Sequence, residues 1–148
     1  MILKTTKDID IRFSEVDSMG VVWHGSYLLY FEDAREAFGA EWGLGYQDYI
    51  DNGHYAPMVE LNFNYKHPLK YGDKARIEIT YQPTISAKVV FDYAIYNRTD
   101  DTLIVTGHSV QVFMDLNYNL VLYDPPFYQA WKERWGIMEQ FQKPNKTE

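Results

Sequence analysis

The sequence contains no cysteine among its 148 residues. Disulfide bridges, thiolate-bound zinc, iron–sulfur clusters and thiol nucleophiles are therefore excluded. It also lacks any apolar run of about 18 residues, the length that a membrane-spanning helix needs. The first twelve residues alternate charged and apolar side chains and do not resemble a signal peptide. These absences predict a cytoplasmic protein without a membrane span.

Positive charge is also scarce, because 14 basic residues face 21 acidic ones and the formal net charge is −7. A broad nucleic-acid-binding face is not expected from such a chain, since phosphate affinity comes mainly from lysine and arginine. Aromatic residues, by contrast, make up 17% of the sequence. That fraction is typical of a folded core and not of a disordered chain. We expect one domain over residues 1–142 and a polar tail over residues 143–148.

Several catalytic signatures are missing. The chain has no G-x-S-x-G nucleophile motif, no phosphate-binding loop, no dinucleotide-binding glycine motif and no pair of histidines at zinc-protease spacing. The segment that starts at Asp115 imitates the beginning of a calcium loop, but Leu120 replaces its glycine and Pro126 its glutamate. We therefore expect neither a metal site nor a cofactor.

The first half of the chain predicts a strand and then a long helix. Ile9, Ile11 and Phe13 alternate with polar residues, which indicates a strand over residues 8–13. A helix is expected over residues 26–42, with Ser26 as its N-cap and glycines after its end. Its apolar positions recur at helical spacing: Tyr27, Tyr30, Phe31, Ala34 and Phe38. A short second helix is expected over residues 45–50.

The second half predicts a run of strands and a final helix. Alternating apolar residues indicate strands over 59–67, 76–82, 89–95 and 103–115, with a short one over 120–123. Gly107 inside the longest strand indicates a bulge or a close approach. A helix opens at Pro125, and its apolar stripe is expected at Phe127, Ala130, Trp131, Arg134, Trp135 and Met138. The order indicates an α+β domain in which an antiparallel sheet of about five to six strands wraps one buried helix.

Asp17 lies in a turn just before the start of the long helix. A helix N-terminus carries unpaired N–H groups and a positive dipole end, which favour a charged carboxylate. Such a carboxylate could act as a general base or nucleophile on a carbonyl that the N–H groups polarise. Aspartate also caps turns without any catalytic role. From spacing alone, capping is the favoured interpretation.

The segment around Asp17 resembles a known family. It matches the pattern D-x-x-G-V-V-x-H-x-x-Y-x-x-Y-F-E-x-A-R of the hotdog-fold acyl-CoA thioesterases, in particular the 4-hydroxybenzoyl-CoA thioesterase branch with its YbgC-type members. The matching residues are Asp17, Gly20, Val21, Val22, His24, Tyr27, Tyr30, Phe31, Glu32, Ala34 and Arg35. A second, supporting block starts at Pro57 and ends with the Gly72-Asp73 turn.

The resemblance implies a hotdog fold and hydrolysis of acyl-CoA thioesters to free acid and CoA. Asp17 would be the general base or nucleophile, and the backbone N–H near His24 would hold the thioester oxygen. The His24 ring could add a polar contact or have only a structural role. Substrate-binding residues are expected at Gly20, Trp23, Gly25, Tyr27, Met58, Val59, Glu60 and Lys88. Some relatives use a glutamate on the long helix, and Glu32 and Glu36 keep that alternative open.

The resemblance also implies an assembly, a homodimer or homotetramer with active sites at the subunit interface. Lys88 is the one basic residue in the region where relatives bind the CoA phosphates, with Lys66, Lys70, Lys74 and Arg76 as further candidates. An acyl-carrier-protein substrate therefore stays open. Two other interpretations are a hotdog hydratase, for which a suitably placed histidine is missing, and a non-catalytic dimer that binds acyl ligands or proteins.

Overall fold

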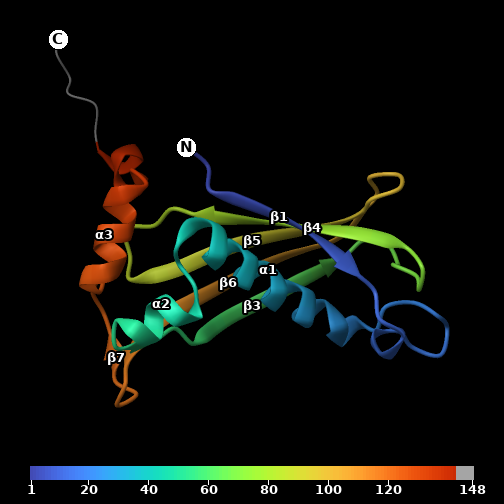
Figure 1. Cartoon of the computed structure of the whole chain (residues 1–148), viewed down its shortest axis with the longest axis horizontal. Coiled ribbons are helices and arrows are strands. Elements are labelled where there is room, and N and C mark those ends of the chain that lie inside the picture. Colours follow the sequence, from blue (N-terminus) through green and yellow to red (C-terminus); the bar gives the residue numbers. More distant parts are fainter. Residues whose placement is uncertain (143–148) are drawn as a thin grey trace, which may run out of the picture.

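The computed structural model describes residues 1–142, and the tail expected over 143–148 lies outside the described residues. One antiparallel sheet of seven strands is wrapped around a long helix (Figure 1). The strands are β1 (Lys4–Asp10), β2 (His54–Tyr55), β3 (Met58–Tyr65), β4 (Lys74–Gln82), β5 (Lys88–Asn97), β6 (Leu103–Asp115) and β7 (Leu120–Val121). The helices are α1 (Tyr27–Trp42), α2 (Tyr46–Asp51) and α3 (Pro126–Arg134). This is the expected hotdog arrangement, with seven strands in place of the five to six expected, because the two-residue strand β2 carries no alternation that predicts it.

The order of the long strands is β1-β4-β5-β6-β3, and the two-residue strands β2 and β7 also pair with β6. Strand β6 can serve several neighbours because it is 13 residues long. The order leaves β1 and β3 at the two edges, so one side of β3 has no strand partner within residues 1–142. This free edge becomes important for the site described below.

The core lies between α1 and the concave face of the sheet. The apolar positions predicted for the helix are buried: Tyr27, Tyr30, Phe31, Ala34 and Phe38. The Phe31 ring stacks on Tyr93 with centroids 4.3 Å apart. Gly107 lies opposite Tyr93 on β6, and a Cβ there would collide with the Phe31 ring. The glycine inside the long strand therefore marks a close approach of helix and sheet.

Three details of the sequence-based prediction were wrong. The first strand was expected over 8–13, but β1 ends at Asp10, because its partner β4 begins at Lys74 and offers no further pairing. Ser26 does not cap α1 with its side chain, because its hydroxyl donates to the backbone oxygen of Glu15. The buried stripe of α3 contains Tyr128, Trp131 and Lys132, whereas Ala130 and Arg134 are exposed.

Helix α3 closes one end of the sheet through a buried lysine. Lys132 is 1% exposed, and its ammonium donates to the backbone oxygen of Thr84 at 2.8 Å and to Asp124 Oδ2 at 2.9 Å. The neighbouring Tyr128 hydroxyl donates to the backbone oxygen of Lys88. Because both contacts reach the connection between β4 and β5, they hold α3 to that end of the sheet.

Candidate active site

The turn around Asp17 is a short hydrogen-bonded loop. Val16 pairs with Val22, and the Asp17 N–H donates to the Val21 oxygen at 2.8 Å. Gly20 has a φ of +77°, a left-handed conformation that glycine adopts without strain. The Asp17 carboxylate accepts the Met19 N–H through Oδ1 at 2.8 Å, and the Val21 N–H lies 3.4 Å from the same oxygen. The side chain is half-buried, and one carboxylate oxygen is held while the other has no partner within residues 1–142.

The start of α1 supplies N–H donors beside this turn. A 3-10 turn, His24–Ser26, leads into the helix. The N–H groups of His24 and Gly25 donate to no acceptor within residues 1–142, as expected at a helix start. The Trp23 ring covers Gly25, so a Cβ at Gly25 would collide with it. The exposed His24 ring lies 4.7 Å from that of Trp23, and its nitrogens bond to no described residue.

Three side chains that the sequence analysis did not assign to the site hold the turn against the helix. The Tyr30 hydroxyl donates to Glu15 Oε1 at 3.0 Å, and the same oxygen accepts the Arg12 N–H at 2.7 Å. Ser26 donates to the Glu15 backbone oxygen. Burial, followed by the Glu15 bond, raises the pKa of Tyr30 well above its usual value, so the hydroxyl keeps its proton. No local pattern in the sequence signals this role, because the Tyr30–Glu15 hydrogen bond joins residues 15 positions apart.

Tyr27 and Tyr65 line the other side of the helix start. Their rings lie 5.6 Å apart, and the Tyr65 hydroxyl donates to the backbone oxygen of His24 at 3.0 Å. Burial raises the pKa of Tyr27 to about 12, so this side chain is neutral at physiological pH. The last residue of β3 is thereby fixed next to the start of α1. Six of the predicted site residues meet here: Asp17, Gly20, Trp23, His24, Gly25 and Tyr27.

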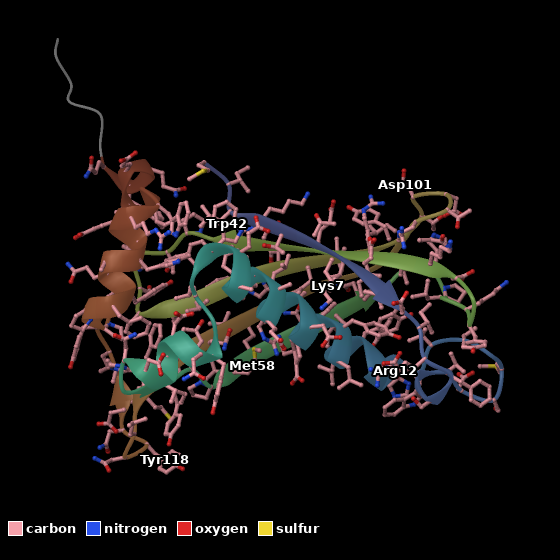
Figure 2. All side chains as sticks on the ribbon, in the orientation of Figure 1. Lys7, Arg12, Trp42, Met58, Asp101 and Tyr118 are labelled. Atoms are coloured by element: carbon pink, nitrogen blue, oxygen red, sulfur yellow. The ribbon has the colours of Figure 1, made fainter. Side chains whose placement is uncertain are left out.

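The other predicted site residues lie at the opposite end of the sheet from the Asp17 turn. Met58 is seven residues before Tyr65 on β3, which corresponds to about 23 Å at 3.3 Å per residue. Lys88 pairs with Val112 and lies close to the Met58–Gln111 pair, at the same end of the sheet. Figure 2 shows Met58 well separated from Arg12, which precedes the Asp17 turn. Within one chain, Met58, Val59, Glu60 and Lys88 are therefore not brought to Asp17.

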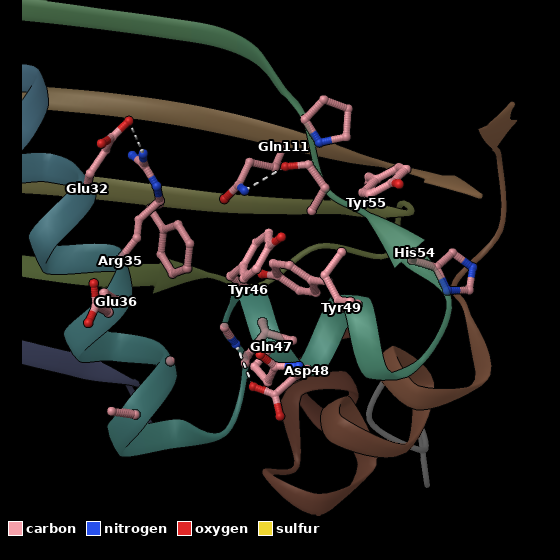
Figure 3. Close-up of a pocket in the computed structure, with 18 residues that line it drawn as sticks. Glu32, Arg35, Glu36, Tyr46, Gln47, Asp48, Tyr49, His54, Tyr55 and Gln111 are labelled. Carbon is pink, nitrogen blue, oxygen red and sulfur yellow. Dashed lines mark hydrogen bonds and ion pairs between the residues drawn. The ribbon is translucent and has the colours of Figure 1, made fainter. Parts of the chain in front are cut away.

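A cavity of about 860 Å³ opens at this far end, between α1, α2 and the chain that leads into β3 (Figure 3). Glu32, Arg35 and Glu36 of α1 line it on one side, and Glu32 and Arg35 form an ion pair at 3.9 Å. Arg35 also donates to the Tyr93 hydroxyl at 3.0 Å. No three histidine, aspartate or glutamate side chains in residues 1–142 converge as a metal site would require.

A turn that presents a carboxylate beside free helix N–H groups, on a sheet wrapped around one helix, is an arrangement that thioester-hydrolysing hotdog proteins could use. Similarity to known protein families and structures agrees with this class. The profile of the Thioesterase-like superfamily matches residues 11–133. The chain therefore belongs to the thioesterase-like superfamily, and the expectation of a thioesterase-family protein is confirmed.

Two relatives show how far the sequence similarity extends. The chain is 37% identical over 103 residues to YneP of Bacillus subtilis, which is named as a candidate acyl-CoA thioesterase. This match covers 70% of this chain and 75% of YneP. It is 25% identical over 114 residues to the acyl-acyl carrier protein thioesterase ATL3 of Arabidopsis thaliana. This match covers 77% of this chain and 60% of ATL3.

Among solved structures, the DHNA-CoA thioesterase of Staphylococcus aureus superposes with a TM-score of 0.79. The two proteins are 25% identical, and the match covers 95% of this chain and 97% of the other. The predicted hotdog fold is thereby confirmed over nearly the whole chain. Among residues 1–142, the helices are too short or too polar to span a bilayer.

Proposed function

We propose that this protein hydrolyses acyl-CoA thioesters to the free acid and CoA. The observation that carries the proposal is the Asp17 turn, in which one carboxylate oxygen is held by backbone N–H groups and the other is left open. The turn is joined to the helix start through Glu15, whose backbone oxygen accepts from the Trp23 N–H and the Ser26 hydroxyl, and the His24 and Gly25 N–H groups of that helix start have no described acceptor. Donors aimed at the oxygen of a carbonyl stabilise the charge that develops there in acyl transfer.

Two routes use this geometry. As a general base, Asp17 removes a proton from water and the hydroxide attacks the thioester carbon. When the tetrahedral intermediate collapses, the CoA thiolate leaves and takes the proton back from Asp17. As a nucleophile, Asp17 attacks the same carbon and expels the thiolate, and water then hydrolyses the acyl anhydride. Both routes consume one water and yield acid and thiol. In both, the His24 and Gly25 N–H groups hold the negative oxygen of the intermediate.

The active site is proposed to be shared between two copies of the chain. Strand β3 has a free edge, and Val59 on it is 59% exposed. A long exposed edge presents unpaired N–H and C=O groups on which a strand of another copy can pair. If two β3 strands pair antiparallel, the Tyr65 end of one copy meets the Met58 end of the other. The Asp17 turn of each copy would then lie near the cavity, Met58 and Lys88 of its partner. Two such dimers would give the expected homotetramer.

Several basic side chains are available for the CoA phosphates. Lys88 is exposed at the far end of the sheet, and Lys70 is exposed beside the Asp17 turn, where its backbone pairs with Val21. Arg76 is a weaker candidate because Asp101 already accepts from it at 2.7 Å. We assign the chain to the 4-hydroxybenzoyl-CoA thioesterase branch on the strength of the Asp17–Arg35 motif. A cytoplasmic location and independence from cofactors remain predictions.

An acyl-carrier-protein substrate is the second candidate, favoured by the similarity to ATL3 and by the small number of cations near Lys88. Carrier proteins are acidic and would meet a chain of net charge −7, so any docking patch must be local. The third candidate function is a non-catalytic dimer that binds acyl ligands.

Thiol release tests these candidates. Short, long, branched and aromatic acyl groups are each presented on CoA and on carrier protein. Release from the CoA esters supports the proposal, and release only from carrier protein supports the second candidate. Saturable binding without release from either carrier contradicts hydrolysis and leaves the non-catalytic dimer.

A further inference from the structure

Glu15 is the residue through which the Asp17 turn is tied to the start of α1. Within residues 1–142, every hydrogen bond that joins the segment 13–22 to the segment 23–30 ends on Glu15. Its backbone oxygen accepts the Trp23 N–H and the Ser26 hydroxyl, each at 2.9 Å. Its side-chain oxygen Oε1 accepts the Tyr30 hydroxyl at 3.0 Å. One residue therefore fixes the turn relative to the helix.

The other hydrogen bonds of the turn do not provide this connection. The Asp17 N–H donates to the Val21 oxygen, and the Gly20 oxygen accepts the Tyr71 N–H at 2.9 Å. These bonds shape the turn and attach it to the loop between β3 and β4, but they do not reach α1. Without its contacts through Glu15, the turn would keep its shape and lose its fixed place against the helix.

The Glu15 side chain is itself held from two sides. Oε1 also accepts the Arg12 N–H at 2.7 Å, a contact that closes the 3-10 turn Phe13–Glu15. On the helix side, Tyr30 is 1% exposed, and its ring lies 5.9 Å from that of Tyr27. Burial raises the pKa of Tyr30 above its usual value, so its hydroxyl remains a donor at neutral pH. A buried tyrosine has only two side-chain torsions and is a rigid anchor for Glu15.

The position that Glu15 controls is the one on which the proposed reaction depends. Asp17 follows Glu15 by two residues, which span at most about 7 Å of extended chain. Trp23, which donates to the Glu15 oxygen, directly precedes His24 and Gly25, whose N–H groups are the proposed donors to the thioester oxygen. A misplacement of about 1 Å between a catalytic group and the reacting atoms can slow a reaction by about 10²-fold.

We propose that Glu15 is a positioning residue for Asp17, which fixes the Asp17 carboxylate relative to the N–H groups at the start of α1, with Tyr30 as its anchor. This inference rests on the proposed thioester hydrolysis. The role requires an acceptor at Oε1 and not a negative charge, because the Tyr30 hydroxyl and the Arg12 N–H are both neutral donors. Glutamine keeps such an acceptor, whereas leucine does not. This difference separates positioning from proton transfer, which requires the carboxylate itself.

The test compares three variants by thiol release from the best acyl-CoA ester. Tyr30→Phe removes the donor and Glu15→Leu the acceptor, so kcat should fall by about tenfold in the first and by up to about 10²-fold in the second. KM should stay within about threefold, because neither side chain is proposed to contact the ester. Glu15→Gln should keep kcat within about threefold of the wild type. Tyr81→Phe, the matched control, also removes a buried hydroxyl, which bonds to Tyr128 of α3, and should leave kcat unchanged.

A double-mutant cycle shows whether Tyr30 and Glu15 act through Asp17. In the Asp17→Asn background there is no carboxylate to position, so adding Tyr30→Phe should lower the residual kcat by no more than about twofold. A full tenfold loss in both backgrounds would overturn the positioning role. Equal losses in Glu15→Gln and Glu15→Leu would overturn it too, because the charge would then be what matters.

Amide hydrogen exchange at Trp23, whose N–H donates to the Glu15 oxygen, separates this inference from the proposed function. Exchange should be about tenfold faster in Tyr30→Phe than in Tyr81→Phe. Faster exchange together with a wild type that hydrolyses no ester would contradict hydrolysis and support the hold of Glu15 on the turn, whereas equal exchange would overturn that hold. Full kcat in Tyr30→Phe would overturn the positioning role and leave hydrolysis standing. If Glu15→Leu does not fold, Tyr30→Phe and the cycle decide.

Discussion

Asp17 and His24 contribute to the proposed site in different ways. The Asp17 side chain offers an open carboxylate oxygen, whereas His24 offers its backbone N–H, and its ring is exposed and bonds to no described residue. A substitution of His24 removes the ring and keeps the N–H. The two residues should therefore respond very differently to mutation.

The first prediction concerns the His24 ring. His24→Ala should lower kcat for acyl-CoA hydrolysis by less than about fivefold, since removal of a true acid–base group costs about 10²-fold or more. Steady-state thiol release checks this, with His108→Ala as a control, because His108 bonds to Asp92 and lines neither the Asp17 turn nor the cavity. A loss of a hundredfold or more in His24→Ala would show that the imidazole itself takes part.

Much of this residue-level description was available from the sequence. The Asp17–Arg35 motif pointed to the turn, and six predicted site residues do meet at the start of α1. The sequence could not show that Glu15 and Tyr30 hold the turn, because their hydrogen bond joins residues 15 positions apart. Nor could it show that Gln111 donates from β6 to the Ala56 carbonyl, because these residues are 55 positions apart.

At the scale of elements, the helices and long strands were predictable because each carries its own periodicity. Their ends were less so. Ile11 and Phe13 continue the alternation of β1, yet pairing stops at Asp10 where β4 begins. In α3 the sequence favoured an apolar stripe, but Lys132 is buried because Thr84 and Asp124 satisfy its ammonium. Both outcomes depend on tertiary partners and not on local pattern.

The second prediction concerns this lysine. Lys132→Met should destabilise the protein by about 3–5 kcal/mol, because it leaves the Asp124 carboxylate, 21% exposed, without its cation. Chemical denaturation monitored by tryptophan fluorescence measures the change. Glu133→Gln, at an exposed position on the same helix, is the control and should alter the stability by no more than about 0.5 kcal/mol. Equal stability of the two variants would show that α3 is not held by Lys132.

At the scale of the whole molecule, the two groups of site residues lie at opposite ends of β3, and the third prediction follows from this separation. Val59→Lys places a charge on the free edge, so it should convert a wild-type dimer or tetramer to monomers and abolish hydrolysis. Sedimentation velocity and thiol release on the same samples check both effects. Thr80→Lys, on the sheet away from β3, should change neither. A fully active monomeric wild type would contradict the shared site.

The buried tyrosines predict how stability depends on alkaline pH. Burial raises the pKa of six of them: Tyr27, Tyr30, Tyr49, Tyr81, Tyr93 and Tyr128. In the unfolded chain tyrosine ionises near pH 10, at about its model-peptide pKa. The protonated hydroxyls therefore contribute their full share of the folding stability below pH 10. This share is lost as the pH rises through the pKa of each tyrosine in the folded protein, which is about 12 for Tyr27.

This fourth prediction is checked by recording tyrosinate absorbance and circular dichroism together during an alkaline titration. The ionisation of the buried tyrosines should coincide with loss of the folded signal. Ionisation of all thirteen tyrosines near pH 10 with the fold intact would contradict it.

The most direct test of the account is steady-state thiol release by Asp17→Asn with the best acyl-CoA ester of the wild type. The substitution keeps the shape of the side chain and its acceptor for the Met19 N–H, but it removes the charge. We predict that kcat falls by about 10²–10⁴-fold while the melting temperature and ester binding persist. Asp10→Asn, an exposed carboxylate at the end of β1, should keep full activity. Unchanged turnover in Asp17→Asn would contradict the central claim and direct attention to Glu32 and Glu36.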